Sequence, residues 1–177
     1  MSGLGTLPPR IRRGTAADAQ TCAAIEAACA RQFLDSPHPQ VADRPVPPPA
    51  AHVAAAERGE LWVIEPGEGG GVAGFAWLVE AAPELYVAEL DVAPRFQRRG
   101  LARALLDRAA EIARGRGLTG LCLTTYVDVV WNAPAYARMG FRTLSPDAAP
   151  EICRADAARL AALGYDPACR TAMRRPL

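Results

Sequence analysis

The segment LDVAPRFQRRGLARA, residues 90–104, carries most of the information about the fold of this chain. Residues 85–92 alternate in the way that a strand does, and Pro94 ends the run. Gly100 follows in a tight turn, directly before residues 101–115, whose apolar side chains recur with helical spacing. A strand, a turn and a helix in this order aim several backbone N–H groups and the positive helix end at one place. Such a place suits a phosphate group.

Several function classes are excluded by composition. The segment lacks the GxGxxG spacing, so a dinucleotide-binding Rossmann domain is not predicted. All 20 basic residues are Arg, which excludes a Walker phosphate loop and Schiff-base lysine chemistry. The net charge is +1, so no overall field attracts nucleic acid or an acidic membrane. No apolar run is long enough to span a bilayer.

Outward from this segment, strands and helices alternate along the chain. We predict strands at residues 11–13, 61–64, 72–79, 85–92, 121–125, 141–144 and 170–173. Helices are predicted at residues 15–33, 49–59, 101–115, 132–139 and 152–163. This order indicates an α/β (α+β) fold with a mixed, mostly antiparallel central sheet of about seven strands flanked by helices. We expect residues 10–177 to form one domain behind a loose tail, residues 1–9.

The remaining features favour a protein without metal or disulfides. The five cysteines are scattered, with no CxxC pair and no nearby histidine, which favours reduced thiols in a cytoplasm. Residues 35–49 hold six prolines and are predicted to be irregular, either as a lid or as a disordered loop. His38 and His52 lie in or near that segment and are expected to be exposed, with a role in substrate binding as the alternative. Cys22 and Cys29 are expected to be small core residues, and Trp62, Trp77 and Trp131 are expected in the core or along a cleft wall.

Two short motifs resemble those of one protein family. Residues 97–102, QRRGLA, resemble the Gln/Arg-x-x-Gly-x-Gly/Ala acyl-CoA loop of the GNAT superfamily of N-acetyltransferases. Residues 135–141, AYARMGF, are similar to its Tyr-x-x-x-Gly-Phe helix-to-strand element. The order of elements from residue 11 to residue 173 also resembles that family. The resemblance therefore covers most of the chain.

The resemblance implies where acetyl-CoA binds. The strands at 85–92 and 121–125 would splay apart, and the pantetheine arm would pair with the backbone near Leu90 and Val92. The amides of residues 98–102 would hold the pyrophosphate. The implied cofactor-binding residues are Leu90, Asp91, Val92, Gln97, Arg98, Arg99, Gly100, Leu101, Ala102, Arg103 and Asn132.

The resemblance also implies catalytic roles, with alternatives left open. Tyr136 would protonate or hydrogen-bond the departing thiolate, although it could instead be a packed aromatic residue. Glu89 is the preferred general base, because members of the family often carry an acid in this region. Asp91 is its rival, with capping of the nearby loop as its other role, and a solvated strand face is the alternative for both acids. Thr124 and Thr125 stand where some members carry a Glu, so a water chain without a single base is an alternative. Asn132 fits a helix cap and also a CoA contact.

The predicted activity is transfer of an acetyl group from acetyl-CoA to a primary amine of a small molecule or peptide, by direct attack in a ternary complex. The alternative is a non-catalytic acyl-CoA-binding module of the same fold. A nucleic-acid binder based on the Arg-rich residues 95–116 is disfavoured, because Asp107 and Glu111 interrupt the stretch. Since dimers are common in the family, a homodimer is an expectation from the resemblance alone.

Overall fold

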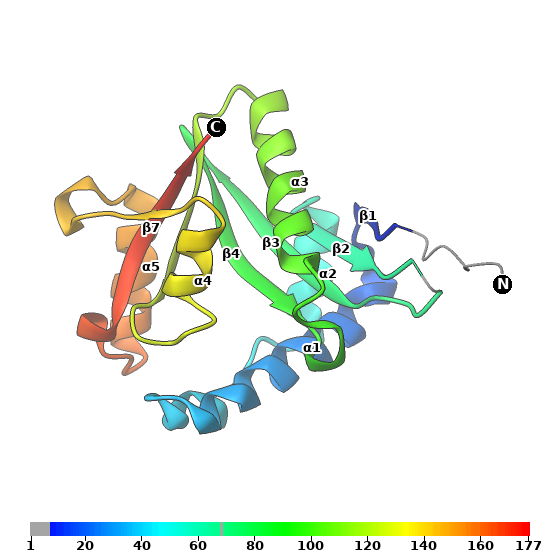
Figure 1. The fold of residues 1–177 in the computed structure, drawn as a ribbon, viewed down its shortest axis with the longest axis horizontal. Coiled ribbons are helices and arrows are strands. Elements are labelled where there is room, and N and C mark those ends of the chain that lie inside the picture. Colours follow the sequence, from blue (N-terminus) through cyan, green and yellow to red (C-terminus); the bar gives the residue numbers. More distant parts are fainter. Residues whose placement is uncertain (1–7, 68) are drawn as a thin grey trace, which may run out of the picture. The chain divides into compact units, whose positions relative to one another are not determined.

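The computed structural model describes residues 8–67 and 69–177 of the chain. Most of the predicted tail, residues 1–9, lies outside the described residues. Seven strands form one sheet in the order β1-β2-β3-β4-β5-β7-β6 (Figure 1). Their bounds are Arg10–Arg13 (β1), Leu61–Glu65 (β2), Gly74–Ala81 (β3), Glu84–Val92 (β4), Gly120–Tyr126 (β5), Arg142–Thr143 (β6) and Arg170–Pro176 (β7).

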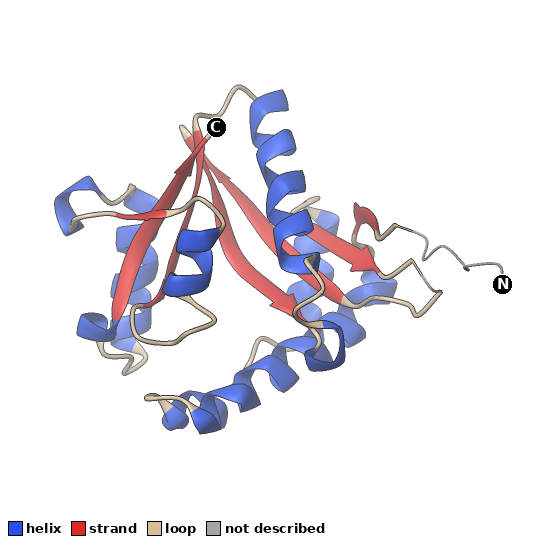
Figure 2. Ribbon diagram, in the orientation of Figure 1, coloured by secondary structure: helices blue, strands red, loops and turns tan. Residues whose placement is uncertain are grey.

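Among the described residues, five α-helices accompany the sheet (Figure 2). They are Ala19–Arg31 (α1), Pro49–Glu57 (α2), Leu101–Gly115 (α3), Ala133–Arg138 (α4) and Glu151–Ala162 (α5). Strands β1 and β2, β2 and β3, β5 and β7, and β6 and β7 pair antiparallel, whereas β4 and β5 pair parallel. The predicted mixed, mostly antiparallel sheet with flanking helices is therefore confirmed.

The chain forms two compact units, Met1–Trp77 with Glu89–Arg108, and Leu78–Ala88 with Ala109–Leu177. We call them the first and the second unit. Strands β3 and β4 and helix α3 each contribute to both. The prediction of a single domain stays a prediction.

The first unit is built around an apolar core between α1, α2 and the strands. Helix α1 is preceded by a reciprocal cap, in which the Asp18 carboxylate accepts from the Thr15 N–H at 2.8 Å and from its hydroxyl at 2.9 Å. Arg12 in β1 donates two further bonds to Asp18, so the strand and the helix start are tied together. The core consists of Cys22, Ile25, Ala55, Leu61, Val63 and Phe75.

The second unit is organised by β5, whose seven residues all pair with β7. The predicted last strand, residues 170–173, extends to Pro176 because these pairs continue along β5. Helix α5 packs on β5 and β7 (Figure 1). The core of the second unit includes Tyr86, Cys122, Ala149 and Cys153. Within the described part of this unit, the parallel ladder of β4 and β5 joins three pairs, at Glu84, Leu85 and Tyr86.

Two sequence predictions were wrong. Part of the Pro-rich segment is regular, because Pro39–Asp43 forms a 3-10 helix in which proline occupies the first turn, where it needs no N–H. His38 and His52 are buried, with 6% and 0% exposure; His52 lies in α2 one turn before the buried Ala55, on the face that points into the core. Trp62 is buried as predicted, whereas Trp131 is 40% exposed, so its place along a cleft wall stays a prediction.

Candidate functional site

The turn between β4 and α3 has an unusual backbone. Pro94–Phe96 forms a 3-10 turn, after which Arg98 and Gly100 both have positive φ angles, of 61° and 80°. A non-glycine residue such as Arg98 rarely adopts this conformation, and such strain gathers at binding sites. Where residues of left-handed and right-handed backbone conformation alternate, successive N–H groups point toward one place and form a concavity that suits an anion. A Cβ atom on Gly100 would meet nothing within 4 Å, so the space in front of the turn is open.

Helix α3 begins directly behind this turn. Its first backbone bond runs from the Ala104 N–H to the Gly100 carbonyl, at 3.0 Å. The N–H groups of residues 101–103 precede this bond and therefore have no partner within the helix. The dipole of a helix 15 residues long adds positive potential at the same point. The turn and the helix start thus suit a diphosphate.

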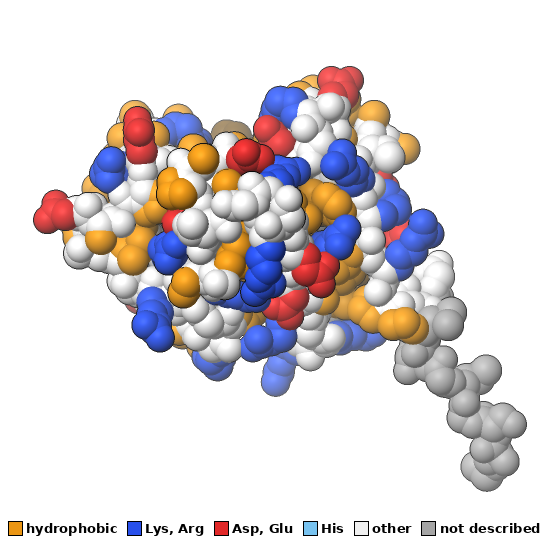
Figure 3. All heavy atoms as spheres, turned by 90° about the horizontal axis from the view of Figure 1, so that it is seen from above, with side chains coloured by type: hydrophobic (Ala, Val, Ile, Leu, Met, Phe, Trp, Pro, Cys, Tyr) orange, Lys and Arg blue, Asp and Glu red, His pale blue; other side chains and the backbone are white. Residues whose placement is uncertain are grey.

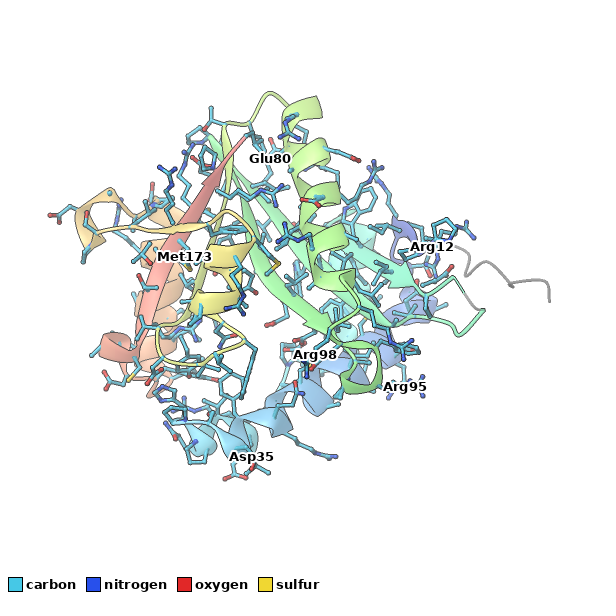
Figure 4. The ribbon with its side chains drawn as sticks, in the orientation of Figure 1. Arg12, Asp35, Glu80, Arg95, Arg98 and Met173 are labelled. Atoms are coloured by element: carbon cyan, nitrogen blue, oxygen red, sulfur yellow. The ribbon has the colours of Figure 1, made fainter. Side chains whose placement is uncertain are left out.

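Arginine side chains surround the turn, as Figure 4 shows for Arg95 and Arg98. Arg98, Arg99 and Arg103 are exposed, whereas Leu101 is buried and anchors the helix. Arg95 and Arg99 lie over the ring of Phe96, at 4.8 and 5.6 Å from its centroid. The ring holds two of the cations close to the turn.

The side chain of Gln97 holds the turn in place through hydrogen bonds. Its Nε2 donates to the Val92 carbonyl at 2.9 Å and to Gln32 Oε1 at 2.9 Å, and Gln32 Nε2 donates back at 3.1 Å. Gln97 therefore links the turn, the end of β4 and the residue that follows α1. These bonds give Gln97 a positioning role, and its predicted contact with the cofactor stays a prediction.

We expect Gln97→Ala to weaken acetyl-CoA binding about 5- to 10-fold, because it removes the bond that joins the turn to the Val92 carbonyl, and one such bond is worth about 1 kcal/mol. Isothermal titration calorimetry measures this change. Gln32→Ala is the matched control, since it keeps the bond from Gln97 to Val92 and should cause a smaller loss. Equal losses in the two variants would contradict the bracing role.

The end of β4 is the second part of the site. The Val92 carbonyl accepts from Gln97 and also from the Cys29 thiol, at 3.3 Å. Both of its lone pairs are engaged. Cys29 is half-buried against β4 and is not simply a core residue.

Acidic side chains gather beside this strand end. Glu89, Leu90 and Asp91 are half-buried. Burial, followed by the charges of Glu89 and Glu26, raises the pKa of Asp91 well above its ordinary value. Burial also raises the pKa of the Cys29 thiol. The simple reading of a solvated acidic face is therefore wrong.

Glu26 and His52 form a buried pair near these acids, and the sequence did not identify either as a candidate site residue. His52 Nε2 lies 3.1 Å from Glu26 Oε2, and both side chains are nearly inaccessible. Burial raises the pKa of Glu26 to about 8, with the charge of Glu89 as the second cause. Burial lowers the pKa of His52. One signal was present: Glu26 lies between Cys22 and Cys29 on the apolar face of α1, where an acid is out of place.

Stability should depend on the ionisation of Glu26. In the folded chain it keeps its proton up to a pH of about 8, but in the unfolded chain it loses it near 4.5. Between these values the folded state binds more protons, so the free energy of unfolding falls as pH rises, by up to about 1.4 kcal/mol per pH unit. Glu26→Gln should flatten this decline, as measured by urea unfolding between pH 5 and pH 8.5. Parallel curves for both proteins would contradict the burial of an ionisable Glu26.

The second unit holds the other predicted catalytic residue. Tyr136 lies in α4, half-buried, with its ring edge-to-face on Phe141 at 5.6 Å. Asn132 precedes α4 as predicted, but its side chain makes no capping bond. Its backbone carbonyl instead accepts from the N–H groups of Ala135 and Tyr136.

A further acid in this unit was not found from the sequence. Asp156 in α5 accepts from the Thr124 hydroxyl at 2.6 Å and from Arg159 at 2.7 Å. Burial raises the pKa of Asp156, but these bonds and one from Tyr86 outweigh it and the pKa is lowered. A carboxylate thus lies beside Thr124, although residues 124 and 125 themselves carry none.

The described residues show neither a candidate metal site nor a helix that could span a membrane. Residues 8–67 and 69–177 contain no group of three or more His, Cys, Asp or Glu side chains that could hold a metal ion. None of the helices in this part of the chain is long and apolar enough to cross a membrane.

Comparison with known proteins gives consistent matches. Residues 24–141 match the model of the Acetyltransferase (GNAT) family. N-alpha-acetyltransferase RimI of Mycobacterium tuberculosis is 34% identical over 143 residues, which are 77% of this chain and 84% of that protein. Streptothricin acetyltransferase of Streptomyces lavendulae is 39% identical over 88 residues, 47% of this chain and 45% of that one.

The fold has solved counterparts. N-acetylglutamate synthase of Neisseria gonorrhoeae, solved with coenzyme A and N-acetyl-glutamate, superimposes with a TM-score of 0.67 and 24% identity. The match covers 96% of this chain but 35% of that one. This similarity is one of fold.

Proposed function

The chain belongs to the GNAT family of acetyltransferases, which take the acetyl group from acetyl-CoA, and we propose that its acceptor is a primary amine of a small molecule or a peptide. Binding of acetyl-CoA is supported by the turn before α3, where Arg98 and Gly100 adopt positive φ angles in front of a 15-residue helix. This arrangement suits the pyrophosphate of CoA. The amides of residues 98–102 would hold it, and Arg98, Arg99 and Arg103 would supply charge.

Three groups would serve the chemical step. Glu89 would take a proton from the amine, with Asp91 or a water chain as alternatives. The Val92 N–H would stabilise the oxyanion that forms when the amine attacks the thioester. Tyr136, at the motif position for this role, would donate a proton to the departing thiolate. Leu90 and Asn132 remain proposed contacts of the pantetheine arm and of CoA.

Binding of acetyl-CoA is the first test. At a concentration of 100 times Kd it should stabilise the fold by about 2.7 kcal/mol. This raises Tm by roughly 5–10 °C for a protein of this size. CoA lacking the acetyl group should give a similar shift, whereas NAD, which has a diphosphate but no pantetheine, should give a smaller one. No shift at millimolar acetyl-CoA would contradict the proposal.

The acceptor is then found by measuring thiol release with a panel of amines. N-terminal peptides and streptothricin-type antibiotics come first, because the names of the two relatives point to these two classes. Steady release with any acceptor would exclude the alternative of a non-catalytic acyl-CoA-binding module. No observation favours that alternative.

Other predicted properties stay predictions: a cytoplasmic location and a homodimer. Figure 3 shows basic and acidic side chains interspersed on the face in view, with no continuous basic patch over it. This distribution does not favour a nucleic-acid partner.

A further inference from the structure

One edge of β5 lies open in the second unit. In the described part of this unit, the parallel ladder between β4 and β5 ends at the pair of Tyr86 and Cys122. Strand β5 continues to Tyr126, and its remaining residues pair on their other side with β7. On the side of β4 these residues have no strand partner among the described residues. Backbone groups that point to this side are therefore available to side chains or to a ligand.

The hydrogen bonds at the two ends of β5 show which way its backbone groups point. The Val127 N–H donates to the Cys169 carbonyl, and the Leu177 N–H donates to the Thr119 carbonyl, so residues 119 and 127 point toward β7. The direction alternates from one residue to the next along a strand. Thr124 is an odd number of positions from both, so its N–H and carbonyl point away from β7, toward the open edge.

The guanidinium of Arg170 lies at this edge, although Arg170 itself belongs to β7. Its Nη2 donates to the Thr124 carbonyl at 3.3 Å and to the Thr124 hydroxyl at 3.2 Å. The guanidinium carbon also lies over the Tyr126 ring, 4.7 Å from its centroid. The side chain of Arg170 thus crosses β5 on the face that carries Thr124 and Tyr126, and both residues hold it in place.

Among residues 8–67 and 69–177, no carboxylate lies at ion-pair distance from this guanidinium. Asp156 accepts from the same Thr124 hydroxyl, at 2.6 Å, but its own ion pair is with Arg159, at 2.7 Å. The Nε of Arg170 is buried and donates to no group in this part of the chain. A buried N–H of a charged group without an acceptor costs free energy, and a bound ion or ligand is one of the few explanations for it.

Asp156 positions the guanidinium through Thr124. The Thr124 hydroxyl gives its hydrogen to Asp156, so its lone pairs face Arg170 and Tyr86, whose hydroxyl lies 3.5 Å away. Since Arg159 neutralises Asp156, the group as a whole carries the positive charge of Arg170. This charge attracts an anionic group and repels a purely cationic acceptor such as a polyamine.

We propose that Arg170 binds a carboxylate of the acceptor, so that the acceptor is an amine that also carries a carboxylate, as a free amino acid or as an acidic peptide. The inference rests on the proposed function, because the open edge of β5 is where the resemblance implies that the thioester arm enters. The Nε and Nη1 groups of Arg170 make no hydrogen bond within the described chain and are the donors left for the carboxylate. The residue is half-buried, so the guanidinium is not closed off from a ligand.

Matched acceptors give the first test on the wild-type protein. Alanine is compared with alaninamide, and the C-terminal amide of alanyl-glutamate with that of alanyl-glutamine, so that each pair differs in one carboxylate. In at least one pair KM should be about 10-fold or more lower for the acid, because hydrogen bonds to charged groups are stronger than neutral ones. The first pair tests a free amino acid and the second an acidic side chain. Equal KM values, or lower values for the uncharged member, in both pairs would overturn the proposal.

Substitutions of Arg170 give the second test. Arg170→Gln should raise KM for the preferred acid about 10-fold or more and KM for its uncharged partner less than about twofold, because only the acid loses a charged donor. Arg170→Lys keeps the charge without the planar group and should lie between. Arg142→Gln removes an exposed charge from β6 of the same unit and is the matched control. If KM rises equally for acid and uncharged partner, Arg170 has a structural role and the proposal is wrong.

Proton–nitrogen correlation NMR of the full chain gives a readout that needs no turnover. The Nε–H signal of Arg170 is assigned by its loss in Arg170→Gln and is followed while the two pairs of compounds are added in the presence of CoA. It should move with alanine or with the alanyl-glutamate amide and stay in place with their uncharged partners. A signal that stays in place with both acids would refute the carboxylate site. Failure to bind acetyl-CoA, or to release thiol with any acceptor, would instead refute the proposed function.

Discussion

Gly100→Val should abolish detectable acetyl-CoA binding, with a loss of affinity of at least about 100-fold, or about 2.7 kcal/mol. Gly100 has a φ angle of 80°, and a Cβ atom there would project into open space in front of the turn. The side chain would stand where the diphosphate must approach the amides. Calorimetry and the acetyl-CoA-dependent rise in Tm measure the loss.

The matched control for this variant is Gly117→Val, beyond the other end of α3. Gly117 has a φ angle of 71°, and its Cβ would also meet nothing within 4 Å. Both variants should lose about 1–2 kcal/mol of stability, because a β-branched residue is strained at positive φ. Only Gly100→Val should lose binding. If Gly117→Val loses it equally, the effect is backbone strain and the turn is not the anion site.

Tyr136→Phe should reduce the turnover of acetyl-CoA with the identified acceptor by about 100-fold, because general acids contribute factors of this size. Binding of acetyl-CoA should change less than twofold, since the ring and its edge-to-face contact with Phe141 remain. Thiol release and calorimetry on the same preparation separate the two quantities.

Tyr165→Phe is the control for loss of a phenol hydroxyl elsewhere in the second unit. It should keep wild-type turnover. A Tyr136→Phe variant with unchanged kcat would exclude Tyr136 as the proton donor, and a parallel loss of acetyl-CoA binding would assign it a structural or binding role instead.

Much of the local structure could be predicted from the sequence. The run at 85–92, the turn at Gly100 and the helix after it were all placed correctly, because periodicity, Pro94 and Gly100 act over a few residues. The Thr15–Asp18 cap formed as its spacing predicted. The seven-stranded mixed sheet followed from the order of these elements.

The chemistry of single side chains was less accessible. The hydrogen bonds of Gln97 to Gln32 and to the Val92 carbonyl could not be predicted, because Gln32 lies 65 positions away in the sequence. The nearest histidine to the acids, His52, was expected to be exposed and is fully buried. Asp156 lies 32 positions after the Thr124 that it binds. Patterns over a few neighbouring residues cannot predict contacts between side chains that lie far apart in the sequence.

By itself, then, the sequence determined the elements, their order and the turn at Gly100, since each depends on neighbours along the chain. Only the tertiary structure decided the ionisation of the acids, because Glu26, His52 and Glu89 come from two helices and a strand that are far apart in sequence. A pKa is set by burial and by nearby charge, and both are properties of packing.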